Sequence, residues 1–99
     1  MSRDIRKVID IDREDERRQC VEDLIADEGP DWEKLHQPGS FGCHELLDRT
    51  ALVADLMERY VLSHPACVQN AEWHSLAGQA ADALHELYQR VGKAHLSAQ

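Results

Sequence analysis

The chain has 99 residues, of which 42% are hydrophobic, 30% are charged and 5% are aromatic, and its 19 acidic and 11 basic residues give a formal net charge of -8. A chain of this length can bury one core but has little room for a second domain or an enclosed active-site cavity, so we expect a single domain over residues 1–99. The acidic balance and the lack of a basic stripe argue against direct nucleic-acid binding, because neutralising phosphates requires clustered cations.

The first third of the chain predicts one charged helix. Residues 12–19 are eight consecutive polar residues, and a single helix over 4–27 would place two arginines on its buried side. We therefore expect a shorter helix, over about residues 13–27, that ends at Gly29. Residues 1–11 are then either a mobile arm or an extension packed on the bundle.

A regular apolar pattern predicts a long second helix over about residues 43–63. It begins near Ser40 and ends before Pro65, because the residue before a proline disfavours the helical conformation. The apolar residues that we expect to face the neighbouring helix, which we call the seam, follow spacings of 4, 3, 4, 3 and 4. The seam residues are Cys43, Leu47, Thr50, Ala54, Met57 and Val61.

A third helix is predicted over about residues 70–91, with Asn70 as its N-cap and Gly92 as its C-terminal cap. Its apolar stripe is formed by Trp73, Leu76, Ala77, Ala80, Leu84, Leu87 and Val91. A linking segment of about six residues is typical of antiparallel neighbours in a bundle. The sequence therefore predicts an all-α fold: a small helical bundle built on an antiparallel pair of long helices, with the shorter N-terminal helix packed on it.

Targeting and cysteine patterns favour a cytoplasmic protein. No apolar stretch approaches the roughly 18 residues that cross a bilayer, and the N-terminus is too charged for a secretory signal, so we expect no membrane partner. Three cysteines, an odd number without a secretion signal, argue against a disulfide framework and for buried thiols. They are Cys20, Cys43 and Cys67.

Six histidines raise the hypothesis of a metal site. A carboxylate and an imidazole from each of two facing helices can hold a metal in a bundle. The candidates are His44, Asp48, His74, Asp82 and His85. Because they lie beside the apolar seams rather than in them, we expect hydrogen-bonding histidines and no bound cofactor. Cys43 has a neighbouring histidine but no group to orient it, so we expect no catalytic site and no enzyme.

Several segments of the second half resemble a family of small uncharacterised helical proteins from proteobacteria and their mobile elements. The resemblance covers residues 40–96, leaves the acidic first third outside it, and implies a fold but no activity or catalytic residue. It rests on a C-H-E-x-L-D-R … H-P … W … L-Y-Q pattern, which is formed by residues 43–50, His64-Pro65-Ala66, Trp73 and residues 87–92.

The leading functional hypothesis is a non-enzymatic protein-interaction module whose uncovered apolar stripes find a partner or a second copy, as in a homodimer. Its acidic surface favours a basic partner. A specific form is a small phage-related regulator or inhibitor that mimics nucleic acid on a basic surface. The partner-binding candidates are Glu14, Asp15, Glu16, Glu22, Asp23, Asp27, Glu28 and Asp31.

Two alternatives stand beside this hypothesis. The acidic cluster has a purely structural interpretation, as a solvated helix face on which Arg13, Arg17 and Arg18 balance the carboxylates. The competing function is a metal-binding helical bundle that uses the five histidine and aspartate candidates.

Overall fold

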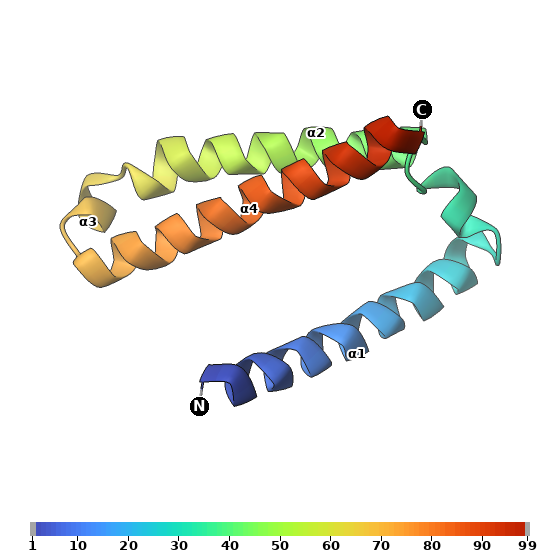
Figure 1. The fold of residues 1–99 in the computed structure, drawn as a ribbon, viewed down its shortest axis with the longest axis horizontal. Coiled ribbons are helices and arrows are strands. Elements are labelled where there is room, and N and C mark those ends of the chain that lie inside the picture. Colours follow the sequence, from blue (N-terminus) through green and yellow to red (C-terminus); the bar gives the residue numbers. More distant parts are fainter. Residues whose placement is uncertain (1, 99) are drawn as a thin grey trace. The chain divides into compact units, whose positions relative to one another are not determined.

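The computed structural model describes residues 2–98, with side chains from Ile11 to Ala98. This part of the chain contains helices and no strand, which confirms the predicted all-α class (Figure 1). The chain divides into two compact units, residues 1–34 and 35–99, where the sequence predicted one domain. In chain order the elements are α1 (Ser2–Glu28), the 3-10 turn η1 (Trp32–Leu35), α2 (Phe41–Leu56), the π-helical turn η2 (Met57–Leu62), α3 (Pro65–Val68) and α4 (Ala71–Ala98).

The first unit is built on α1, one continuous helix, so the prediction that the helix begins near residue 13 was wrong. None of its side chains from 11 to 28 is buried. Arg13 Nη1 lies 2.9 Å from Glu16 Oε2, and Arg17 Nη2 lies 2.6 Å from Glu14 Oε1. The prediction had assumed that a helix needs a buried apolar stripe. Residues with high helix propensity and attractive pairs three or four residues apart stabilise α1 instead.

The end of α1 is the one the sequence predicted. Gly29 adopts a φ of 93°, in the left-handed region that favours glycine. Its N–H donates to the Ile25 carbonyl at 2.9 Å, which satisfies one of the last free carbonyls of the helix. The side chains of residues 1–10, which could cover the bundle, lie outside the described residues. The packing of α1 on the other helices stays a prediction.

The second unit is a hairpin in which α2 and η2 run beside α4 (Figure 1). Both predicted helix starts are confirmed: Ser40 Oγ accepts from the Cys43 N–H at 3.2 Å, and Asn70 Oδ1 accepts from the Trp73 N–H at 3.0 Å. The predicted end at Gly92 was wrong, because α4 continues to Ala98. A glycine at this position lies against the neighbouring helix instead of capping its own.

The core of the hairpin is a narrow seam of small side chains. From α2 it buries Cys43, Thr50 and Ala54, as predicted, and the Thr50 hydroxyl donates to the Leu46 carbonyl at 2.8 Å. From α4 it buries Ala77, Ala81 and His95, whereas much of the predicted stripe is exposed. Small residues occupy the buried positions because they let the two helix backbones approach closely. The exposed members of the predicted stripe are Trp73, Leu76, Ala80 and Leu87.

The π-helical turn η2 shifts the seam by one residue. Val61, predicted to be buried, is 44% exposed, and Leu62 takes its place with its Cδ1 4.0 Å from a Cβ built on Gly78. A π-turn holds one residue more than an α-turn, so the next seam residue after Met57 comes five positions later instead of four. The apolar pattern alone did not reveal this insertion.

Candidate functional site

The five predicted metal candidates do not converge. His44 Nε2 lies 3.3 Å from Asp48 Oδ2 along α2, while His85 pairs with Glu58 and not with the predicted Asp82. Residues 74 and 82 lie on α4 with exposed side chains. Within the part of the chain that has described side chains, no three His, Cys, Asp or Glu groups are placed to hold a metal ion.

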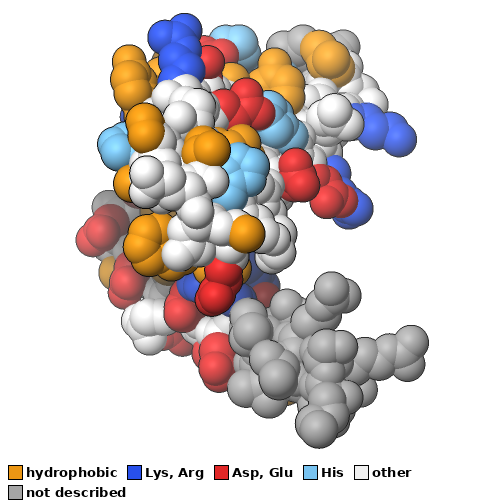
Figure 2. Space-filling model, turned by 90° about the vertical axis from the view of Figure 1, so that its left-hand side faces the viewer, with side chains coloured by type: hydrophobic (Ala, Val, Ile, Leu, Met, Phe, Trp, Pro, Cys, Tyr) orange, Lys and Arg blue, Asp and Glu red, His pale blue; other side chains and the backbone are white. Residues whose placement is uncertain are grey.

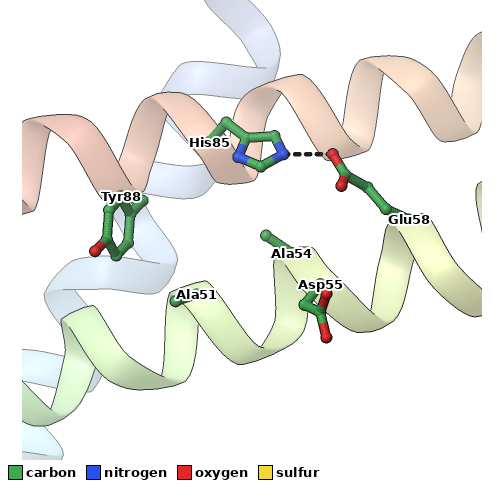
Figure 3. A pocket seen from close by; sticks show the side chains of 6 residues that line it. All are labelled: Ala51, Ala54, Asp55, Glu58, His85 and Tyr88. Carbon is green, nitrogen blue, oxygen red and sulfur yellow. Dashed lines mark hydrogen bonds and ion pairs between the residues drawn. The ribbon is translucent and has the colours of Figure 1, made fainter.

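One hollow of about 230 Å³ opens beside the seam, where η2 and α4 face each other. Figure 3 shows Glu58 and His85 pointing toward one another across it, with His85 Nε2 2.6 Å from Glu58 Oε1 and Asp55 turned away from the pair. Two alanines form its floor and an aromatic ring stands at one side. Its lining consists of Ala51, Ala54, Asp55, Glu58, His85 and Tyr88.

The Glu58–His85 pair in this hollow links the two helices and has no features of a catalytic site. The side chains of Glu58 and His85 are 49% and 51% exposed, so solvent screens both of them. The lining holds no serine, threonine or cysteine for the imidazole to activate as a nucleophile. Sequence reasoning missed Glu58, although Glu58 and His85 each directly follow a seam residue, Met57 and Leu84, and such positions meet across an antiparallel pair.

A second histidine contact closes the open end of the hairpin. His95 is 3% exposed, and its Nδ1 accepts the Gly39 N–H at 2.9 Å. Its ring centroid lies 5.7 Å from that of His44. The hydrogen bond holds the loop before α2 against the last turns of α4. Sequence reasoning missed His95 because the predicted helix ended before it.

The acidic candidates of the first unit are spread over α1, apart from Asp31 in the loop that follows it, and all are at least partly exposed. Arg17 donates to both Glu14 carboxylate oxygens, at 2.9 and 2.6 Å, and these hydrogen bonds lower the pKa of Glu14 and raise that of Arg17. Asp23 Oδ1 accepts from Gln19 Nε2 at 3.2 Å. Arg13 and Arg17 thus balance the acidic residues only in the first part of the described helix.

Between Arg18 and Lys34 the sequence of the first unit is acidic throughout. Residues 19–33 contain six acidic residues and no lysine or arginine, and the last turn of α1 carries no basic side chain. Carboxylates at a helix C-terminus lie close to its partial negative charge, which is unfavourable. The acidic residues of this stretch are Glu22, Asp23, Asp27, Glu28, Asp31 and Glu33.

Apolar surface is the other conspicuous feature. Sixteen large hydrophobic side chains between residues 11 and 98 are 40–79% exposed, and Figure 2 shows hydrophobic groups reaching the surface of the hairpin. Exposed apolar side chains that lie next to one another mark interaction surfaces. Cys20 is exposed and Cys67 half-buried, so the prediction of buried thiols holds fully only for Cys43.

The chain matches no protein-family model, no curated protein and no solved structure. The resemblance noted for residues 40–96 therefore stays an expectation. No helix in the described residues is long and apolar enough to span a membrane.

Proposed function

We propose that the protein is a non-enzymatic interaction module that acts in the cytoplasm and binds a basic surface of another protein through α1. The observation that supports this most is the charge of residues 19–33, where six acidic residues occur without a lysine or arginine. The described side chains of α1 are at the surface, so they are available to a partner.

The energetics of α1 support a role in binding. Asp27 lies in the last turn of α1, which has no basic side chain, and a carboxylate in that position costs helix stability. A cationic partner at this end would relieve that cost and gain attraction from the carboxylates at the same time. Half-buried Leu24 and 45% exposed Ile25 lie beside these charges and offer apolar contact.

The specific form of the proposal is a small regulator or inhibitor, of phage origin, that occupies a nucleic-acid-binding surface of its target. A rigid helix with regularly spaced carboxylates offers a basic groove the negative charges that phosphates would supply. Such a protein would have no direct affinity for nucleic acid and would compete with it for the same partner.

The test uses an oligolysine peptide as the cationic probe and the full chain as the ligand, measured by titration calorimetry. One variant neutralises four carboxylates of α1: Glu22→Gln, Asp23→Asn, Asp27→Asn and Glu28→Gln. A matched control removes the same charge from the hairpin: Glu45→Gln, Asp55→Asn, Glu72→Gln and Asp82→Asn. We expect the α1 variant to bind at least about tenfold more weakly, a loss of about 1.4 kcal/mol, and the control to bind nearly as the wild type.

Two results would contradict the proposal. Equal losses in both variants would mean that the probe senses net charge only. Binding that does not weaken between low and physiological salt would rule out an electrostatic interface at the surface, because the screening length falls to about 8 Å at physiological ionic strength.

The metal-binding alternative is tested separately by elemental analysis of untagged protein. A stoichiometric metal that is lost on His85→Ala would favour the alternative. Folded protein without metal would contradict it.

A further inference from the structure

The hairpin buries few large apolar side chains within itself. Its buried hydrophobic residues are all small, and no large side chain of the described residues is fully buried. Burying one methylene contributes about 0.8 kcal/mol, whereas ordering one residue costs about 1.5 kcal/mol. Covering its half-exposed apolar side chains would therefore add to the stability of the hairpin. Its buried hydrophobic residues are Cys43, Ala54, Ala77 and Ala81.

Part of the exposed apolar surface lies in a strip to which both helices contribute, and we call this strip the outer apolar face. Leu47 and Gly92 lie against each other, and Glu58 pairs with His85. This antiparallel register sets Val53 opposite Leu87, so both helices contribute to the same strip. Its side chains are 41–58% exposed. They are Leu46, Val53 and Leu56 of α2 and Trp73, Leu76 and Leu87 of α4.

The other side of the seam is polar. It carries the Glu58–His85 pair and the His44–Asp48 pair. The residues that directly follow the seam positions occupy this side. Those that directly precede them, such as Val53 before Ala54 and Leu76 before Ala77, occupy the outer apolar face. The hairpin is thus amphipathic as a whole, with one apolar and one polar face.

The size of the outer apolar face fits one protein interface. Five aliphatic side chains and one tryptophan, each about half exposed, leave roughly 400 Å² of apolar surface if a free aliphatic side chain offers about 120 Å² and a free tryptophan about 200 Å². A standard interface buries about 800 Å² on each partner, of which somewhat more than half is apolar. A second hairpin is therefore enough to cover the strip.

The charges on the strip permit a second copy of this acidic chain. Its positions hold no aspartate or glutamate, and their two charges, Arg49 and Arg90, pair with Glu45 and Glu86 of their own helices at 3.5 and 2.7 Å. Two copies can then meet without facing carboxylates, although each chain carries a net charge of -8. With the residues that lie between its six apolar side chains included, the positions along the strip are Leu46, Arg49, Val53, Leu56, Trp73, Leu76, Ala80, Ala83, Leu87 and Arg90.

We propose that two copies of the chain pack through their outer apolar faces, about a two-fold axis, into a four-helix bundle. A two-fold dimer uses the same patch on both subunits, so each hairpin covers the other, and the four helices enclose the large side chains that one hairpin leaves exposed. The inference does not rest on the proposed function, because that function uses the carboxylates of α1.

The experiment measures the solution mass of the full chain by light scattering and its thermal unfolding over a hundredfold range of concentration. We expect about twice the chain mass of 11.3 kDa and a melting temperature that rises with concentration. Leu87→Glu places a carboxylate on both faces and should reduce the mass to that of one chain. Leu52→Glu is the matched control, since Leu52 is 57% exposed on α2 but lies outside the strip, and it should stay dimeric.

A monomeric wild type with a concentration-independent melting temperature would overturn the inference and point to α1 or another protein as the cover. Equal dissociation of both leucine variants would also overturn it. If Leu87→Glu fails to fold, the concentration dependence of the wild type still decides. The neutralised α1 variant should remain dimeric, so failure of the proposed function is distinguishable from failure of the dimer.

Discussion

The two longest helices, α1 with 27 residues and α4 with 28, are supported in different ways. On α1, attractive pairs between residues three or four apart hold the helix, and none of its side chains from 11 to 28 is buried. On α4, the buried Ala77, Ala81 and His95 pack on the neighbouring helix. Helix length therefore does not distinguish a helix that buries side chains against a neighbour from one whose side chains are exposed. The placement of small residues and of charge does.

The largest expected effect is that of Gly42→Ala at the start of α2. A Cβ at this position would overlap His36 Nδ1 and lie 2.5 Å from the Leu35 carbonyl oxygen. Backbone atoms cannot rotate away as side chains do, so we expect a loss of about 3 kcal/mol in unfolding free energy, the upper range for overpacking. Urea denaturation of the hairpin measures it, and the helical carbon shifts of α1 should stay unchanged. A variant as stable as the wild type would contradict the close approach of the loop.

The next effect is that of His95→Ala. It removes the acceptor of the Gly39 N–H and leaves a gap where a buried ring stood. We expect a loss of about 2 kcal/mol, typical of a partly buried donor left unsatisfied. His74→Ala, at an exposed position of the same helix, serves as the control and should change little. Equal effects of the two substitutions would show that the end of α4 does not fasten the hairpin.

Gly92→Ala should stabilise the hairpin, whereas the two preceding substitutions should destabilise it. A Cβ there would lie 3.5 Å from Leu47 Cδ1, an ordinary contact, and the helix continues through the position. Alanine is favoured over glycine in a helix interior by about 1 kcal/mol, so the variant should be more stable by about that amount. Thermal unfolding followed by circular dichroism measures the gain. Destabilisation would mean that α4 ends near residue 91, as the sequence first indicated.

The smallest effect concerns pH and α1. Hydrogen bonds from Arg17 lower the pKa of Glu14 from its ordinary value of 4.5. The pair therefore stabilises α1 fully above pH 4.5, and that contribution is lost as the pH falls through the lower pKa of the folded helix. Carbon chemical shifts of residues 14–18 should show the loss of helicity. The matched Glu14→Gln variant should lack this step, and a step of the same size in it would contradict the assignment.

The hairpin was largely predictable because its pattern is local and regular. Ser40 and Asn70 are strong N-caps, and the α2 seam from Cys43 to Met57 follows the helical period. The seam of α4 was misjudged because large apolar residues dominate a hydrophobic pattern. Close packing buried Ala77, which the predicted stripe included, and Ala81, which it did not.

The remaining errors have two physical origins. The length of α1 was underestimated because burial was taken as a condition for helix formation, although residues with high helix propensity and attractive pairs such as Arg17 and Glu14 reduce that need. Glu58 and His85 meet only once the register of two helices is known, which periodicity does not give. Gly39 and His95 lie 56 positions apart in the sequence, so their contact was not predictable for the same reason.

The π-turn at η2 has a consequence for how the length of this chain can change. Since Leu62 and not Val61 reaches the seam, the segment holds one residue more than regular packing needs. Deleting the exposed Tyr60 would return Leu62 to a spacing of four from Met57 and restore an ordinary α-helix. A homologue that lacks one residue here would thus keep the same hairpin, and an alignment gap inside this helix would mark a preserved fold.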